Sequence, residues 1–544
     1  MGLATRRLLV AVVLGMLVGA CSTSDAKGPA TAAAAVQANK AEKVLPLSRD
    51  EEGPALLVDK DDPNTVYLAY SEMTSGACRF SVSTDRGATW RVEATPVLEP
   101  YTRNCAMGYA TSQNIRTELK QGPDGTIYDI FQANAPDKNG SRSVMIGRSS
   151  DGGRSWQTAA IDPANKAPEP GVEMEVNFEG HIAIDPANSK RIYAMWRRSF
   201  NRFTPAKTTN PYMSVSEDGG ATWAPPQLMF SRNNGFDGPR PVVVGDKLWA
   251  FWRESAPPLP TNQDGPSPAP PVTRLFASVS TDKGKTWTDH EISNANDSSE
   301  PVPLYDAKRG VFHVVWHDNR AKELDAYYSS SRDGITWTAP KRLNDDPTDT
   351  LRGQHYPQIS MSPDGRLDVA WYDWRDDPFP PSTVGNGQTL SLFSNRGVFA
   401  AVYMTSSRDG GATWTKNVRV SDVPIDRGVG TWENNIDVMA PIAIASSNAA
   451  AIVAWSDTRN ANATTVAAPN RAGNASNQTQ DIFTGTTTFG KADTRRVTGF
   501  QAGFVGMLLG LGLAMCLALV LTRRQQPPAL APAKRVTKEP EPVT

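Results

Sequence analysis

The stretch "SEDGGATW" at residues 216–223 recurs along the chain, and its repetition decides the fold. Four more full copies and one copy shorter by a residue stand at 83–90 ("STDRGATW"), 149–156 ("SSDGGRSW"), 280–287 ("STDKGKTW"), 407–414 ("SRDGGATW") and 331–337 ("SRDGITW"). The tryptophans that end the copies are 50 to 77 residues apart. This spacing predicts a repeat architecture, because a four-stranded antiparallel unit with variable loops has this size.

Each copy, called a box below, has side chains that can stabilise a turn through hydrogen bonds within that turn. Its serine and aspartate can hydrogen-bond nearby backbone N–H groups, and its glycine adopts backbone angles that other residues resist. Its tryptophan offers a large face for packing between sheets. We therefore predict a structural role, without a ligand, for the aspartates and tryptophans of the six boxes: Asp85, Trp90, Asp151, Trp156, Asp218, Trp223, Asp282, Trp287, Asp333, Trp337, Asp409 and Trp414.

A second signal precedes each box, namely a short β-run, a turn and a more apolar β-run that ends in an aromatic residue. The clearest example is "YPQISMSPDGRLDVAWYDWR" at 356–375, and six others begin at residues 53, 115, 180, 238, 300 and 440. Pro-Asp-Gly and Asp-Pro-Ala-Asn at their centres are typical of hairpin turns. Each unit thus predicts strand, turn, strand, loop, strand, box, strand, and the chain is expected to be all-β.

These boxes resemble the Asp boxes, or BNR repeats, of bacterial sialidases and related β-propellers, and the resemblance covers residues 43–497. It implies a β-propeller of four-stranded antiparallel blades. Six boxes but seven paired β-runs favour seven blades, with six, the usual sialidase number, as the alternative. The segment near Glu42 resembles the strand that comes after a box elsewhere in the chain, so we expect it to supply the last blade's missing fourth strand and to close the ring.

Both ends of the chain carry membrane signals. Residues 1–21 predict a secretory signal whose final "VGAC" resembles a bacterial lipobox, so that Cys21 would be lipidated; simple cleavage or an uncleaved anchor is the alternative. Residues 22–42 are expected to be a flexible spacer. Residues 499–521 predict one transmembrane helix, and the arginines after it place the tail 522–544 in the cytoplasm. The propeller is therefore expected outside the cytoplasm, anchored in a bacterial cell envelope.

Charge and cysteine content narrow the possible partners. The chain has 56 basic and 57 acidic residues, which gives no electrostatic reason to expect nucleic acid as a partner. Cys78 and Cys105 would lie in an oxidising compartment, where a disulfide is possible, although one buried and one loop thiol is the alternative. No Cys/His cluster with metal-ligand spacing occurs, so we expect neither a metal nor a cofactor.

Strand direction predicts two different faces for the propeller. If the first strand of each blade descends, the boxes and the hairpins between strands one and two share one face, the box face. The longer connections share the opposite one, the loop face, and a site is expected at its central mouth. Three second strands end there in a W-x-D-x-R motif. In the structural interpretation of this motif, each Asp pairs with an Arg of a neighbouring blade instead of binding a ligand. The motif's charged residues are Asp318, Arg320, Asp373, Arg375, Asp457 and Arg459.

The starts of the first strands add further candidates at the same mouth. They are Arg116, Glu179, His181, Asp237, Arg240, Glu300, His355 and Asp437. Five arginines from five blades (116, 240, 320, 375 and 459) would favour an anionic ligand or one rich in hydrogen-bond acceptors, because a guanidinium binds a carboxylate in two places. Charged residues at a mouth are nevertheless often simply solvated.

The resemblance implies sialidase chemistry only in part. That family uses three arginines, a Tyr–Glu pair and an Asp. Its first arginine stands in an Arg-Ile-Pro motif, which this chain lacks; the nearest analogue is "GPRPV" around Arg240. The catalytic residues are thus unassigned. The sequence favours a module that binds a glycan or protein ligand, with an exo-sialidase or another glycoside hydrolase acting on acidic sugars as the alternative. Three arginines converging in one pocket would favour the enzyme.

Overall fold

A computed structural model gives the fold. It describes residues 42–43, 51–72, 77–97, 102–104, 118–134, 142–162, 175–200, 208–231, 235–255, 272–296, 298–321, 323–348, 350, 352–378, 399–426, 441–460 and 480–489. All of them belong to one compact unit that ends at Phe489. The predicted membrane segments, Cys21 and residues 490–544 lie outside the described residues, and the described part contains no helix long and apolar enough to cross a membrane.

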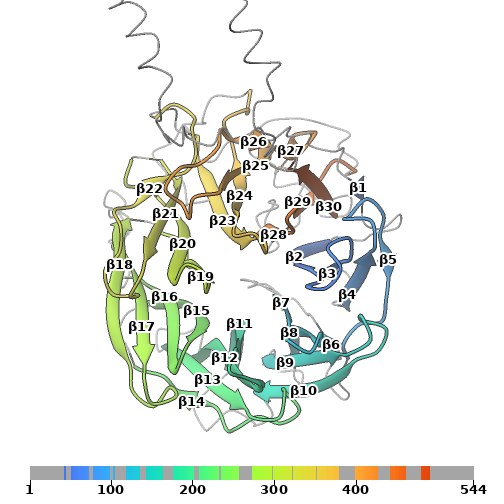
Figure 1. The fold of residues 1–544 in the computed structure, drawn as a ribbon, viewed down its shortest axis with the longest axis vertical. Coiled ribbons are helices and arrows are strands. Elements are labelled where there is room, and N and C mark those ends of the chain that lie inside the picture. The colour runs from blue at the N-terminus through green and yellow to red at the C-terminus, as the bar shows by residue number, and fades with distance from the viewer. Residues whose placement is uncertain are drawn as a thin grey trace, which may run out of the picture. The chain divides into compact units, whose positions relative to one another are not determined.

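The described strands form seven antiparallel blades of four strands each around a central axis (Figure 1). Blades one to three consist of β2 (Glu51–Val58), β3 (Val66–Glu72), β4 (Ala77–Ser83), β5 (Arg91–Val92); β7 (Glu118–Gln121), β8 (Ile127–Asn134), β9 (Arg142–Ser149), β10 (Gln157–Asp162); and β11 (Glu175–Asp185), β12 (Asn188–Phe200), β13 (Thr208–Ser216), β14 (Gln227–Leu228). Blades four and five consist of β15 (Gly235–Val244), β16 (Lys247–Ser255), β17 (Val272–Ser280), β18 (Thr288–Asn296); and β19 (Val302–Asp306), β20 (Val311–Asp318), β21 (Asp325–Ser331), β22 (Lys341–Arg342). Blades six and seven consist of β23 (Gln354–Met361), β24 (Leu367–Asp373), β25 (Phe399–Ser407), β26 (Val418–Arg419); and β28 (Ala443–Ser446), β29 (Ala450–Asp457), β30 (Asp481–Thr488) and β1 (Glu42–Lys43). Two short extra strands, β6 (Thr102–Asn104) and β27 (Ile425–Asp426), pair with β8 and β25.

The ring closes as the sequence predicts. The N-terminal strand β1 pairs antiparallel with β30, so that Glu42 lies opposite Thr484. A strand from the beginning of the chain thus completes the blade built by its end, and Figure 1 shows β1 beside β30. Seven blades, rather than six, are confirmed. Closure leaves no sheet edge open between the last and the first blade.

The boxes fasten the turns between third and fourth strands. In the box at 216–223, the Ser216 hydroxyl donates to Asp218 and accepts from the Gly220 N–H, while the Thr222 N–H and hydroxyl both donate to Asp218. The boxes at 83, 149, 280 and 407 repeat this set of bonds. These bonds, led by the Thr222 hydroxyl, lower the pKa of Asp218 to about 2.

The box glycines also join neighbouring blades. Gly153 has φ +87°, and a Cβ there would stand 2.1 Å from the ring of Phe80 in the preceding blade. Gly411 has φ +91° and is equally close to Tyr328 of blade five. Only glycine therefore satisfies both the turn and the contact. Each of these boxes belongs to a seam as well as to its own blade.

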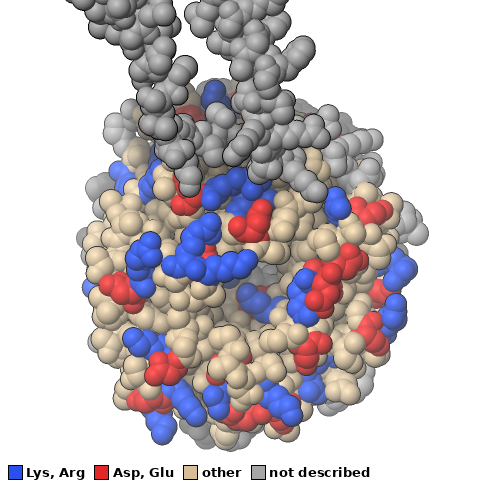
Figure 2. Space-filling view, in the orientation of Figure 1, with Lys and Arg blue, Asp and Glu red and all other residues tan. Residues whose placement is uncertain are grey.

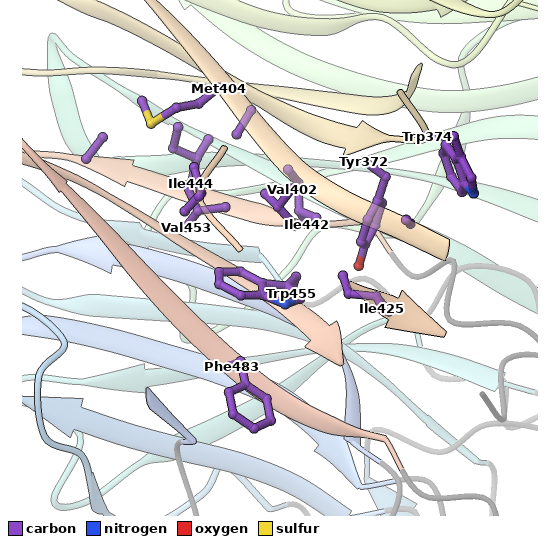
Figure 3. Packing of buried hydrophobic residues seen from close by; sticks show 14 of the residues in the cluster. Tyr372, Trp374, Val402, Met404, Ile425, Ile442, Ile444, Val453, Trp455 and Phe483 are labelled. Carbon is purple, nitrogen blue, oxygen red and sulfur yellow. The ribbon is translucent and has the colours of Figure 1, made fainter. Parts of the chain in front are cut away.

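The hydrophobic core is divided among the seams between blades. The cluster between blades six and seven contains Tyr372, Val402, Ile442, Val453 and Trp455, and Figure 3 shows these side chains meeting from both sheets. Similar clusters lie in the other six seams. Both faces of each second strand are covered by protein. Side chains that alternate to either face of that strand are therefore buried. Strand β24, for example, is buried throughout.

Cys78 lies buried on β4 and is disulfide-bonded. Its predicted partner Cys105 lies outside the described residues, so the pairing of these two cysteines stays a prediction.

Candidate functional site

A cavity of about 870 Å³ runs along the propeller axis, and Figure 2 shows its opening at the centre of the molecule. The seven first strands line it. Most of the lining is apolar backbone and side chain. Among the described lining residues, four have a charged or a histidine side chain: Glu118, Lys120, His181 and Arg240. They come from three successive blades, which concentrates the charge on one side of the cavity wall.

Glu118 is the centre of this charged cluster. Its Oε2 accepts a hydrogen bond of 2.9 Å from the backbone N–H of Ile182 and lies 3.5 Å from Nδ1 of His181. Its Oε1 lies 3.1 Å from Nζ of Lys120. Burial by itself raises the pKa of Glu118, but Lys120, His181 and Arg240 together hold it well below its usual range. The wall therefore carries an ionised carboxylate among cationic groups, with the Lys120 side chain 46% exposed to the cavity and solvent.

Bulges at the loop-face ends of the first strands aim these side chains. The register of β11 shifts between Phe178 and His181, and that of β15 shifts between Asp237 and Arg240. Gly238, inside the second bulge, has φ +65°, and a Cβ there would stand 2.6 Å from Cγ of Glu300. A bulge turns the strand locally and re-aims the next side chain. His181 and Arg240 both come directly after such a bulge and both line the cavity.

In blade six a tyrosine occupies the corresponding strained position. Tyr356 has φ +51° within the bulge of β23, a conformation that costs roughly 1–3 kcal/mol for a residue other than glycine. Its N–H donates to Nδ1 of His317 at 2.9 Å, and the two rings meet edge to face at 5.3 Å. His355 is fully buried beside them, 4.9 Å from the rings of both His317 and Trp374. This group fixes the seam between blades five and six.

The W-x-D-x-R motifs lie between blades, outside the cavity lining. In each, the tryptophan Nε1–H donates to the aspartate and the arginine pairs with that same aspartate, as in Trp316, Asp318 and Arg320. The Asp–Arg pair is thus internal to the motif, which differs from the pairing across blades considered from the sequence. Asp373–Arg375 and Asp457–Arg459 repeat the arrangement with separations of 2.8 and 2.7 Å.

Each motif arginine also reaches the preceding blade. Arg320 donates to Ser293 at 2.7 Å, Arg375 to Asp345 at 2.6 Å, and Arg459 pairs with Asp422 at 2.8 Å. Each guanidinium lies over a ring of its own third strand: Tyr327, Tyr403 and Phe483, at 4.6, 4.4 and 4.0 Å. The guanidinium groups of these three arginines therefore bond within the seams between blades.

Other blades also contain an Arg–carboxylate pair, but its two residues stand at different strand positions, which the sequence pattern alone does not reveal. In blades one and four, the acid at the end of strand two pairs with an arginine on strand three, as Glu72 with Arg79 and Glu254 with Arg274. In blade three, Arg198 pairs with Asp162 of the preceding blade. The Arg-carboxylate pair therefore recurs although its order along the chain does not.

The remaining predicted residues fall into three groups. Arg240 and His181 line the cavity, as described above. Asp237 pairs with Arg197 and Arg253, and Glu300 is 7% exposed. Arg116, Asp437 and the side chain of Glu179 lie outside the described residues. Among the described residues that line the cavity, Arg240 is the single arginine.

Two cavity residues were missed by the sequence reasoning. Glu118 and Lys120 lie on β7 and come after Arg116 at intervals of two in the sequence. Alternation along a strand would have placed all three on one face, so the signal was present in the pattern. Among the described residues, no group of three His, Cys, Asp or Glu side chains is arranged to hold a metal ion.

No protein-family profile and no curated protein matches this sequence. Several solved structures are similar in chain path. A protein of unknown function from Dyadobacter fermentans shares 14% identity with a TM-score of 0.43, covering 84% of this chain and 99% of that one. A Hadza microbial sialidase shares 14% identity (TM-score 0.40, 72% and 73% covered), and an α-L-arabinofuranosidase from Fusarium graminearum shares 14% (TM-score 0.40, 61% and 92%). Similarity at this level gives no information on activity or ligand.

Proposed function

We propose that the chain is an Asp-box propeller of the sialidase-like superfamily that is tethered outside the cytoplasm of a bacterial cell. In this proposal, Cys21 carries a lipid and residues 499–521 form a membrane helix. The bond pattern of the boxes supports the first part, since the serine, aspartate and threonine of the box at 216–223 form one closed set. The tethers are supported by the sequence of the two ends.

The propeller is proposed to bind a glycan or protein ligand in the axial cavity. The observation that carries this proposal is the cluster of Glu118, Lys120, His181 and Arg240 on the cavity wall. The W-x-D-x-R arginines bond within the seams, whereas this cluster borders open space. A cavity of about 870 Å³ is within the size range of sites for small ligands.

The charges of the cluster indicate the ligand class. Lys120 and Arg240 are cationic, Glu118 is ionised, and His181 adds a further positive charge when protonated. A carboxylate can bind Arg240 through two parallel hydrogen bonds, while Glu118 can accept from sugar hydroxyls. An acidic sugar, or an acidic protein segment, offers both kinds of group. Because Glu118 partly neutralises the cations, we expect selectivity from geometry and only modest affinity.

Calorimetric titration with sialyllactose, digalacturonate and neutral lactose tests this function. We expect the acidic sugars to bind more tightly than lactose and their affinity to fall as salt rises. Lys120→Ala and Arg240→Ala should each weaken binding at least about tenfold, since each removes a charged hydrogen bond. The matched control is Arg154→Ala, an exposed arginine in a box that does not line the cavity.

Two results would contradict the proposal. One is equal binding of acidic and neutral sugars, and the other is a loss with Arg154→Ala as large as with Arg240→Ala. Release of free sugar from sialyllactose during the titration would instead favour the alternative, a glycoside hydrolase that acts on acidic sugars.

A further inference from the structure

Both ends of the described chain point to the box face of blade seven. Strand β30 pairs with β29 so that Thr488 lies opposite Ala450, next to the hairpin between β28 and β29. That hairpin belongs to the box face. Strand β1 runs antiparallel to β30, so its N-terminal end is directed toward the same face. Blade seven has no box, and the two chain ends occupy the place that a box occupies in the other blades.

The exit of the C-terminal end is fixed by contacts. The Phe489 N–H donates to the carbonyl of Ala449 at 2.7 Å, and its ring is 9% exposed. The guanidinium of Arg366 lies 3.7 Å from the centre of this ring, and that of Arg408 lies 6.0 Å from it. The chain therefore leaves the propeller at a defined point beside Arg408.

A basic patch begins at this exit. It consists of four exposed side chains from the turns of blades five and six: Lys308, Arg309, Arg332 and Arg408. They are contiguous, because Arg332 donates to the carbonyl of Arg309 and the Arg309 side chain packs against Gly410, two residues beyond Arg408. Figure 2, which looks onto the box face, shows Lys and Arg gathered over β20 and β23.

The acidic residues near the patch are all hydrogen-bonded, and two of them pair with arginines of the patch itself. Asp306 is buried and pairs with Arg309, and Asp364 accepts from Ser362 and Arg408. Asp333 accepts from backbone N–H groups of its own box, and Asp409 does the same in blade six. By contrast, the β2–β3 turn on the same face carries Asp59, Asp61 and Asp62, and Figure 2 shows Asp and Glu gathered there. The box face is thus polarised, with its basic side next to the chain exit.

An exposed apolar side chain stands in the same box as Arg332 of the patch. Ile335 belongs to the short box of blade five and is 52% exposed, three residues from Arg332. The other boxes have alanine, arginine or lysine in the matching place before the Thr or Ser. A basic patch with an exposed isoleucine in the same box as one of its arginines matches the two components of a lipid surface, the anionic headgroups and the apolar interface below them.

We propose that the box face lies against the membrane and that the basic patch binds anionic phospholipid headgroups, with the loop face directed away. The inference rests on the membrane tether of the proposed function and goes beyond it by fixing the propeller's orientation. Tethers that leave from one face hold that face near the bilayer. The patch beside the C-terminal exit then lies where the surface potential of anionic lipid is strongest, within a Debye length of about 8 Å at physiological salt.

Photo-crosslinking of the full chain in lipid vesicles tests this orientation. The crosslinker p-benzoylphenylalanine replaces Ile335 on the box face or, as a matched control, Val272, which is 54% exposed at the loop-face start of β17. The vesicles contain phosphatidylcholine alone or with phosphatidylglycerol. We expect lipid adducts at Ile335 at several times the yield at Val272, and a yield at Ile335 that rises with phosphatidylglycerol and falls with salt.

Charge variants test the role of the patch. Replacing Lys308, Arg332 and Arg408 together by Gln should remove the dependence on phosphatidylglycerol. Replacing Lys60, Lys190 and Lys247 by Gln makes the same charge change elsewhere on the box face and should leave it intact.

The outcomes separate this inference from the proposed function. Equal adduct yields at Ile335 and Val272, or a yield insensitive to phosphatidylglycerol, overturn the orientation while the tether stands. A chain that does not float with the vesicles overturns both the tether and the orientation. Sugar binding through Arg240 is measured without vesicles, so it fails or succeeds regardless of either result.

Discussion

Replacing Arg366 should destabilise the seam between blades six and seven more than any exposed arginine would. Its side chain is fully buried and forms a forked pair with Asp368, with Nε–Oδ1 and Nη2–Oδ2 distances of 2.9 and 2.8 Å. The same guanidinium donates to the carbonyls of Ser447 and Asn448 in blade seven and covers Phe489. One side chain therefore joins two blades and the chain exit.

The expected loss comes from the charge left behind. Arg366→Met keeps most of the volume but leaves the Asp368 carboxylate, 0% exposed, with only the hydroxyls of Ser406 and Ser446. Breaking a buried pair in this way costs about 3–5 kcal/mol. An unfolding entropy of about 2.1 cal/mol/K per residue over about 450 residues converts this to a melting temperature lower by roughly 3–5 °C.

A double variant separates the buried charge from the lost contacts. Arg366→Met with Asp368→Asn removes the uncompensated carboxylate, so it should recover at least about half of the loss. Thermal unfolding monitored by tryptophan fluorescence compares the unchanged protein, the single variants Arg366→Met and Asp368→Asn, and the double variant. The reasoning is refuted if Arg366→Met melts within about 1 °C of the unchanged protein, or if the double variant loses as much as the two single variants added together.

Three further predictions use the same melting assay. The pKa of Asp218, lowered to about 2 by its box, lies below its unfolded value, so stability should fall as pH falls from about 4 toward 2, and Asp218→Asn should flatten that fall. Burial lowers the pKa of His313 to about 4, so its contribution should be full above about pH 6.5 and lost by about pH 4; His313→Gln should lack this slope. Gly153→Ala, whose Cβ would meet Phe80, should destabilise at least twice as much as Gly125→Ala, which has φ +88° and nothing within 4 Å; equal losses would show that backbone strain alone decides.

The repeat predicted the fold because its chemistry is local. Ser216, Asp218 and Thr222 bond to one another within one turn, so the sequence shows the whole interaction. The pairing of β1 with β30 was predictable for a different reason, since seven paired β-runs and six boxes leave one strand missing. Both inferences needed only the order of elements along the chain.

The site was less predictable because the alternation of side chains along a strand shows only which residues share a face, not what that face meets. It correctly grouped Trp316 and Asp318 of β20 with Arg320, which comes two residues after the strand, but could not tell whether these side chains face the cavity or a neighbouring blade. Among the described residues, the strands that border the cavity are the first strands, so Glu118 and Lys120 lie there while the motif arginines lie in the seams. The pairing of Glu72 with Arg79 shows the same limit, since cross-strand partners are not adjacent in sequence.

The meeting of the chain's two ends in blade seven has a mechanical consequence. If the propeller binds a ligand and is tethered through both ends as proposed, force that pulls on the ligand is resisted at the box face, through β1 and β30. Strand β30 is held lengthwise by a ladder to β29 that extends from Asp481 to Thr488, whereas the described part of the β1 ladder comprises Glu42 and Lys43. Hydrogen bonds that are loaded together in shear resist a pulling force that increases with their number. Under tension the N-terminal strand should slip first, opening the ring at one seam while the C-terminal strand still holds the other blades.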